Sequence, residues 1–577
     1  MAEGANTSGL TKMRKIGASG KRDTNCARDF RRLVKRLPLG ERIEPVEIDI
    51  MMKRGKTSFA PCKFPIICPH DVISAISSHD STLFSKVFVG DRGREGLREF
   101  WQKTKECEWY HDHPYLELFE AMPEQCVPVK VFGDDGPMTK SQCLNIFQFS
   151  SVITKVATML SRWLTFVFVT GTVFSCEEIF EVVAWSFEWL RIGKKPDQDH
   201  KKIPFPAGST RAQQAGELIA NGFKFILTWT VGDLKWLVEC FEFQDNYNHD
   251  SMCHQCMATK SVGLLCGYNY SSEAGWRFAK RLHLIYIYIY IYMQSIGRDV
   301  AITKLPGVHI FGIKLDGMHM LALGILQWAL GAVFFELLQE DFWEATAGPW
   351  QQRYASQLVI AYRDFSHWCK SQGLDTSQRQ FTLARLCLKT LSTSAPYFKG
   401  KAYNTICVAK WVSSLLHADA IAHPDDQHKQ ARAGCIWGYC EVVDVCRGAG
   451  LFLTDEQADE VSKGIQTSLL CHNFLASEAI AKGWLRWVSK PKHHYWQHLG
   501  LAAEKERINP CSHWVFQDED FVGRIIKLAK SCHQLTLVTT VIDNYCLLVQ
   551  ALLHKWTDEF PFQELSEHES SDEAPDA

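Results

Sequence analysis

The sequence predicts an α/β core that is interrupted by a large all-α insertion. Two stretches predict buried strands, at 127–133 and at 223–232, because each is an apolar run that ends in an acidic residue and a break. From about residue 316 to 485, apolar residues recur with the period of a helix and few strand signals interrupt them. A mixed pattern returns at 491–555. The core is therefore expected in two pieces, with a helical block between them.

The composition predicts a globular protein of several domains. The 577 residues are 46% hydrophobic and 22% charged, which argues against bulk disorder. The formal net charge of −2 does not by itself indicate a nucleic-acid partner. The odd number of cysteines, 21, their scatter, and a start without the apolar segment of a signal peptide predict reduced thiols inside the cell.

Six segments are expected along the chain. They are a basic flexible arm at 1–40, a mixed region at 41–120, the first part of the core at 121–300, a helical insertion at 301–488, the end of the core at 489–555 and an acidic tail at 556–577. The basic arm is expected to be a solvated terminus, with phosphate binding as the alternative.

Within the first part of the core, Ile and Tyr alternate strictly over 285–292. We favour the interpretation that this run is the translation of a TA dinucleotide repeat. The alternative is a strand with two apolar faces.

Acidic residues at the ends of the predicted strands are the first candidates for chemistry. Asp134 and Asp135 follow the first strand, Asp233 follows the second, and Glu519 opens a late helix within a run of three acids. Carboxylates hold Mg²⁺ or Mn²⁺, and two such ions about 4 Å apart activate the attacking oxygen in phosphodiester chemistry. The alternatives are an ordinary turn and a helix-capping cluster. Two strand-end aspartates with a helix-borne glutamate after a helical insertion form the layout of a ribonuclease-H-like core.

A Cys-x-x-Cys pair is the second candidate. Cys253 and Cys256 have the spacing of two zinc ligands. The nearest residues that could complete the site are Cys240, His249 and Cys266. The alternative is a pair of free cysteines in a polar loop.

The order of the motifs carries a family resemblance that spans about residues 120–545. The motifs are Asp134-Asp135-Gly136, Gly232-Asp233-Leu234, the Cys253/Cys256 pair, Asp316-Gly317-Met318-His319 at the start of an apolar helix, Pro491-Lys492-His493-His494 with His498-Leu499, and Glu519 with Gly523. This order resembles the DDE/D transposases of the CACTA and Plavaka (KDZ) groups of cut-and-paste DNA transposons. Because the first acid is a doublet, both residues stay candidates.

The resemblance implies an activity, a set of partners and a compartment. It implies Mg²⁺- or Mn²⁺-dependent cleavage and transfer of DNA strands, with the metals at Asp134 or Asp135, Asp233 and Glu519. The implied partners are transposon ends, target DNA and further copies of the chain, and the implied compartment is the nucleus. Near-site or structural roles follow for Asp316, His319 and His493.

Two other function classes are compatible with the sequence. One is a DNA- or chromatin-binding transposon relic without catalytic activity. The other is a helical membrane protein built on the apolar stretches at 164–176, 283–297 and 317–335. The last stretch has no charge but contains His319 and Gln327, so a buried helix in a large α domain explains it more simply, and no membrane is expected.

Overall fold

The computed structural model describes residues 43–54, 58–243, 245–279, 300–388, 390 and 395–557. The predicted basic arm at 1–40, the Ile-Tyr repeat at 285–292 and the acidic tail from residue 558 onward lie outside the described residues. The predictions made for these three segments stay predictions.

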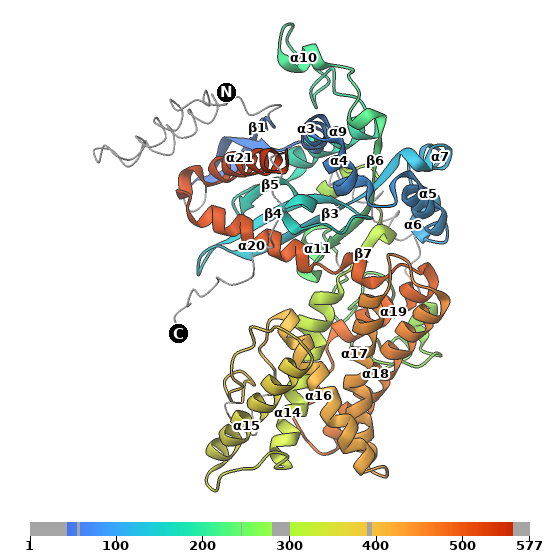
Figure 1. Cartoon of the computed structure of the whole chain (residues 1–577), viewed down its shortest axis with the longest axis vertical. Helices are drawn as coiled ribbons and strands as arrows, with labels where there is room; N and C mark the ends of the chain where they lie inside the picture. Colours follow the sequence, from blue (N-terminus) through green and yellow to red (C-terminus); the bar gives the residue numbers. More distant parts are fainter. Residues whose placement is uncertain are drawn as a thin grey trace, which may run out of the picture. The chain divides into compact units, whose positions relative to one another are not determined.

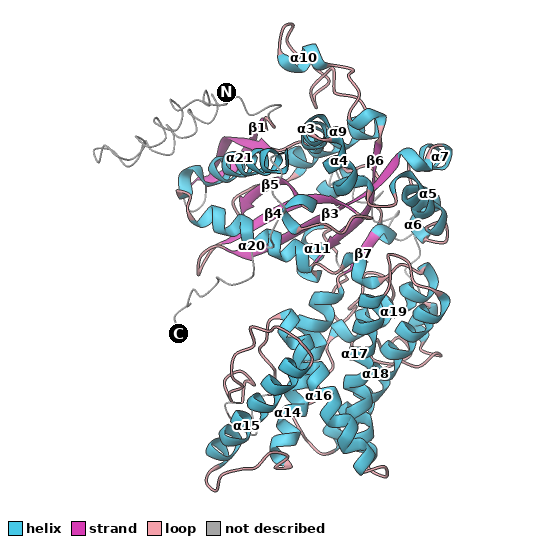
Figure 2. Cartoon of the chain, in the orientation of Figure 1, coloured by secondary structure: helices cyan, strands magenta, loops and turns pink. Residues whose placement is uncertain are grey.

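The two predicted strands are neighbours in a five-stranded mixed sheet (Figure 2). The sheet order is β5-β4-β3-β6-β7, in which β4 and β5 pair antiparallel while β6 and β7 pair parallel. The side chains of β3 and β6 are almost all buried, which explains why both read as continuous apolar runs. The strands are β3 (Cys126–Pro137), β4 (Cys143–Ser151), β5 (Trp163–Val169), β6 (Lys224–Gly232) and β7 (Ile313–Leu315).

The chain divides into two compact units, and the first comprises residues 1–94, 135–225 and 521–577. Part of its core is aromatic, because the rings of Phe88, Trp163 and Phe225 pack together. The backbone N–H of Leu164 in β5 donates a hydrogen bond to the hydroxyl of Tyr545 in α21. Besides β4 and β5 the unit contains β1 (Val46–Arg54), β2 (Ser58–Ile66), α3 (Pro69–His79), α4 (Ser81–Phe84), η2 (Ser85–Val89), α8 (Thr158–Ser161), α9 (Glu177–Ile192), α10 (Thr210–Gln214) and α21 (Leu537–Thr557).

The second unit comprises residues 95–134 and 226–520. It contains the predicted helical region as a set of long helices, α14 to α18, which Figure 1 shows side by side. Its helices are α5 (Gly93–Lys103), α6 (Glu108–His111), α7 (Leu116–Ala121), α11 (Leu234–Cys240), α12 (Gly275–Phe278), η7 (Met318–Ile325), α14 (Leu326–Gln339), α15 (Trp350–Ser371), α16 (Ala402–Ala422), α17 (Gln427–Gly448), α18 (Asp455–Ala481) and α19 (Pro491–Glu506), and α20 (Phe516–Lys530) begins in it.

The uncharged stretch at 317–335 forms η7 and the first part of α14. Both helices pack against α16 and other helices of the second unit, and their apolar side chains are buried there. By length and composition alone, Met318–Gln339 and Gln534–Leu553 could each cross a bilayer. Core helices of soluble proteins meet the same two criteria. The burial of Met318–Gln339 is what a core helix requires. The stretch at 164–176 forms β5 and the turn after it, not a helix.

A buried carboxylate in α14 joins this helix to α17 and to the loop that follows α18. The Glu336 side chain is 3% exposed and lies 3.5 Å from Arg432, 3.1 Å from His428 and 3.5 Å from Arg486. Trp487 donates an indole hydrogen bond of 2.7 Å to the same carboxylate. Although burial opposes ionisation, the hydrogen bond from His428 and the other cations hold the pKa of Glu336 below its usual value. The carboxylate is therefore ionised at neutral pH, and the cationic side chains around it balance its charge.

We expect Glu336→Gln to destabilise the helical region by about 3 kcal/mol, because removing one member of a buried ion network leaves the others without compensation. Urea unfolding followed by circular dichroism would measure it. The matched control is Asp459→Asn, which removes an exposed ion pair with Lys463 and should leave the midpoint unchanged.

The same variant should change the pH dependence of stability. The hydrogen bond to Glu336 raises the pKa of His428, against the effect of its burial. The stabilisation from this raised pKa is complete below pH about 6.5, the unfolded value, and is lost as the pH rises through the folded pKa. The free energy of unfolding of the wild-type protein should therefore decrease as the pH rises above about 6.5. In Glu336→Gln this decrease should be smaller. An equally steep decline in the variant would contradict this account.

Candidate metal centres

A tryptophan explains the glycine that precedes an aspartate in both strands. The predicted end of the first strand at residue 133 is wrong, because β3 continues to Pro137 and contains Asp134 and Asp135. The indole of Trp236 in α11 lies against Gly133 within β3 and against Gly232 at the end of β6. A Cβ on Gly133 would lie 2.0 Å from the ring, and one on Gly232 would lie 2.5 Å from it, so only glycine fits under the ring at either position. The residues that follow the two glycines, Asp134 and Asp233, are consequently held next to each other.

Asp134, Asp233 and Glu519 form an acid cluster. Asp134 is 6% exposed, forms a hydrogen bond with Glu519 and lies close enough to Asp233 for the two charges to interact. Burial, then the hydrogen bond and charge of Glu519, then the charge of Asp233 raise the pKa of Asp134 well above its usual value. Burial also raises the pKa of Glu519. The hydrogen bond with Asp134 acts in the opposite direction and lowers the pKa of Glu519. Two buried carboxyl groups at this distance cannot both ionise at low cost.

The other acids of the two runs have different surroundings. Asp135 follows Asp134 in the strand, so its side chain points to the opposite face of the sheet, and it is half-buried. Asp518 is fully buried beside Lys130, and Asp520 is exposed. Of the doublet at 134 and 135, the structure therefore brings Asp134 to the cluster, and of the run of three it brings Glu519.

Asp316 and His319 lie beside the cluster. The Asp316 carboxylate accepts hydrogen bonds from the backbone N–H groups of Met318, His319 and Val515, and it lies 2.7 Å from Nδ1 of His319. That contact orients the imidazole so that Nε2 of His319 faces Glu519, at 3.4 Å from Oε1. Against burial, Asp316 first and then Asp233 and Asp134 raise the pKa of His319. Asp316 is saturated with hydrogen bonds and acts as a positioning residue.

The acid cluster has the chemistry of a hard-cation site. Its three carboxyl groups come from β3, the end of β6 and the first turn of α20, all within the second unit. Crowded carboxylates repel one another, and either a proton or a cation relieves the repulsion. Asp233 uses one oxygen to cap α11, where it accepts a hydrogen bond of 2.6 Å from the N–H of Trp236. The other oxygen is available for coordination.

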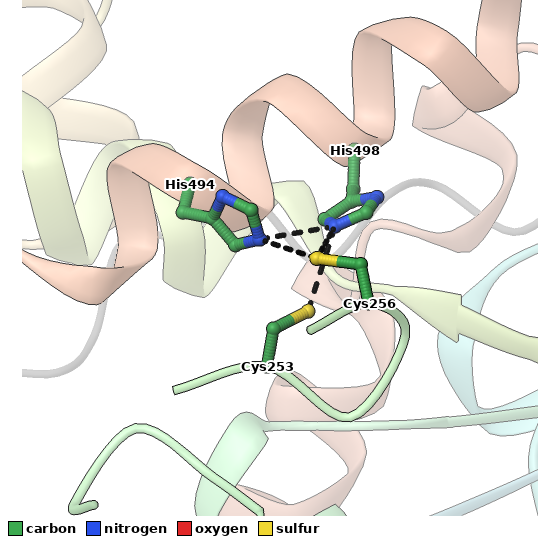
Figure 3. A group of neighbouring side chains, drawn as sticks. All are labelled: Cys253, Cys256, His494 and His498. Carbon is green, nitrogen blue, oxygen red and sulfur yellow. Dashed lines mark hydrogen bonds between the residues drawn. The ribbon is translucent and has the colours of Figure 1, made fainter. Parts of the chain in front are cut away.

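A second group, of two cysteines and two histidines, lies elsewhere in the same unit. Cys253 and Cys256 follow α11 in a loop, and His494 and His498 lie one turn apart on α19 (Figure 3). The four ligand atoms lie within 4.8 Å of one another, so the group could hold a metal ion. Cys256 Sγ is 3.2 Å from His494 Nε2 and 3.3 Å from His498 Nε2, and Cys253 Sγ is 3.5 Å from His498 Nε2. Ligands of tetrahedral zinc are separated by about 3.3–3.8 Å.

The surroundings of this group fix its protonation and orientation. Nδ1 of His494 lies 3.1 Å from the carbonyl of Gly267, which places the proton there and leaves Nε2 free to ligate. Trp276 packs against both histidine rings. Although burial opposes it, the contacts with Cys256, His498 and His494 hold the pKa of Cys253 well below its usual value. A thiolate is the form of cysteine that binds a metal.

The predicted partners of the Cys-x-x-Cys pair need correction. Among the described residues, the group takes its other two members from α19, and Cys240, His249 and Cys266 are not part of it. The reason is that ligands are brought together by folding, and α19 lies more than two hundred residues further along the chain. For His493, the surroundings agree with the structural alternative, because it is fully buried, its ring centroid lies 4.0 Å from that of His472 and it accepts a hydrogen bond from the N–H of Lys490.

Sequence reasoning missed several residues of the two sites. His494 and His498 have the four-residue spacing that places two imidazoles on one helix face, a signal that was available in the sequence. The roles of Trp236, Lys130 and Asp518 had no such signal. No protein-family model matches the chain, and no curated protein matches it.

We expect Gly133→Ala to lower the free energy of unfolding by about 1–3 kcal/mol, because the new methyl group must displace the Trp236 indole. Chemical unfolding would measure this. The matched control is Gly523→Ala in α20, where the added Cβ meets nothing within 4 Å and an alanine should stabilise the helix slightly. Equal stability of the two variants would contradict the contact between Trp236 and Gly133.

Proposed function

We propose that the chain cleaves and transfers DNA strands by divalent-metal-dependent phosphodiester chemistry at Asp134, Asp233 and Glu519. The observation that carries the proposal is the convergence of these three carboxyl groups, which lie almost 400 residues apart in the chain. The order of strands adds support, because the first strand of the sheet, β3, lies at its centre between β4 and β6. Such an order is compatible with a ribonuclease-H-like core.

DNA as the substrate rests on the motif resemblance to cut-and-paste transposases. The carboxylates would hold Mg²⁺ or Mn²⁺, which supplies a polarised phosphate and an activated oxygen nucleophile when bound. The reaction is attack of that oxygen on phosphorus with departure of the alcohol oxygen of the broken bond. A proton held on Asp134 or Glu519 would pass to the solvent on metal binding, since metal ligands must be deprotonated. His319 would hold an imidazole beside Glu519, oriented by Asp316.

We expect the purified chain to nick supercoiled DNA in Mg²⁺ or Mn²⁺, and Asp134→Asn or Asp233→Asn to reduce nicking to the level seen with EDTA. Each substitution removes a charged ligand while it preserves volume. Gel electrophoresis of the plasmid measures the outcome, and oligonucleotide joining measures strand transfer.

Asp135→Asn is the matched control, because this acid points to the other face of the strand. It should keep wild-type nicking. Loss of nicking in Asp135→Asn with retention in Asp134→Asn would overturn the assignment of the first acid. Wild-type protein that binds DNA but shows no metal-dependent cleavage would overturn the enzymatic proposal in favour of a DNA-binding relic.

We propose that the Cys/His group binds zinc and that this zinc is structural. Two thiolates and two imidazoles form the donor set that zinc prefers, and four protein ligands close the coordination sphere. The loop between α11 and α12 contains little regular structure, and a metal held by both cysteines and both histidines would attach this loop to α19. Tyr495 of α19 reinforces the anchor through a hydrogen bond of 3.0 Å to the carbonyl of Met252.

We expect the purified protein to contain about one zinc per chain, measured by plasma mass spectrometry, and Cys253→Ser or His494→Ala to lose it. Chelation should lower the thermal midpoint and expose the loop to limited proteolysis. Cys266→Ser, in the same loop but outside the group, should retain full zinc content. A wild-type protein without zinc and with an unchanged midpoint after chelation would refute this assignment.

A further inference from the structure

A buried lysine occupies the central strand of the sheet. Lys130 in β3 has a side chain that is only 3% exposed. Burying an ammonium group is costly unless it is paired, and lysine is rarely buried for that reason. Lys130 lies on the same face of the strand as Asp134, because Asp134 is four positions further along and side chains alternate between the two faces. Its charge therefore points to the side of the sheet that carries the acid cluster.

Lys130 contacts two points of one short segment. Its Nζ lies 3.7 Å from Oδ2 of Asp518, whose side chain is fully buried, and it donates a hydrogen bond of 3.4 Å to the carbonyl of Ser512. Asp518 directly precedes Glu519 in the first turn of α20. The same lysine therefore holds both ends of the segment that leads into Glu519.

The end of β7 holds the middle of this segment. Nδ1 of His513 lies 2.8 Å from the carbonyl of Leu315, and the N–H of Val515 donates to Asp316 at 3.2 Å. The ring of Trp514 covers Gly317, where a Cβ would lie 2.0 Å from the indole nitrogen. Residues 512–518 are thus held at their two ends by β3 and in the middle by the residues at the end of β7.

Adjacent residues of a helix point about 100° apart, so one turn can present Asp518 and Glu519 to different partners. With Asp518 held at Lys130, Glu519 is directed to Asp134, with which it shares a hydrogen bond. A buried ion pair adds little net stability over an apolar pair of the same size. Its value here is geometric, because it sets the rotation of the helix that carries Glu519.

We propose that Lys130 is a positioning residue for the acid cluster: through Asp518 it sets Glu519 against Asp134 and so controls the affinity of the cluster for divalent cations. The proposal rests on the metal site proposed above. Lys130 acts on the cation through another residue and does not touch it. Loss of such an indirect partner typically weakens metal binding about 10- to 100-fold.

The test is a Mn²⁺ titration of the full chain, loaded with zinc and followed by electron paramagnetic resonance, with thermal midpoints measured in parallel. Lys130→Met should bind Mn²⁺ about 10- to 100-fold more weakly than wild type, and Lys130→Arg, which keeps the charge, should recover part of the affinity. Lys314→Met is the matched control. Lys314 is a buried lysine of β7 whose partner, Glu506, ends α19 and carries no part of the cluster. Lys314→Met should lose stability while it retains Mn²⁺ affinity.

A double variant, Lys130→Met with Asp518→Leu, covers the case in which the single variant fails to fold. The apolar pair should restore the thermal midpoint but not the Mn²⁺ affinity. Wild-type affinity in a folded Lys130→Met, or in the double variant, would overturn the positioning role. Absence of Mn²⁺ binding by wild type, or wild-type affinity in Asp233→Asn, would instead overturn the metal site itself.

Discussion

The contact of one indole with two glycines is the constraint on which the acid cluster depends. Trp236 covers Gly133 within β3 and Gly232 at the end of β6, and this contact fixes the two strands next to each other at these points. Each glycine is followed by an aspartate, so packing of an apolar ring determines the separation of two charged groups. The energy that brings like charges together thus comes from apolar burial and close packing, which repulsion between two carboxylates does not outweigh.

The acids themselves are held by neighbouring polar groups. Asp316 is saturated by backbone and imidazole hydrogen bonds, Asp518 is paired with Lys130, and Asp233 caps α11 with one oxygen. Each of these arrangements leaves fewer ways for the first turn of α20 to move. For the crowded pair that remains, Asp134 and Glu519, burial makes ionisation of both carboxyl groups costly. A bound divalent cation would relieve the same repulsion.

The Cys/His group serves a different part of the same unit. Its two sulfurs come from a loop with little regular structure, and its two imidazoles come from a single face of α19. In the helical region, the buried Glu336 network joins elements through ion pairs and hydrogen bonds. The second unit thus combines long apolar helices with a few buried polar centres that specify how those helices meet.

The sequence by itself determined the two buried strands that carry the aspartates, the helical region and the Cys-x-x-Cys pair, because local periodicity and short spacings encode them. It did not determine the end of β3, which continues past both aspartates to Pro137. Only the tertiary structure decided between Asp134 and Asp135, since the choice depends on which face of the strand meets Glu519. It alone supplied His494 and His498 as partners of the cysteines in place of Cys240, His249 and Cys266. These outcomes depend on contacts between segments hundreds of residues apart, which no local pattern contains.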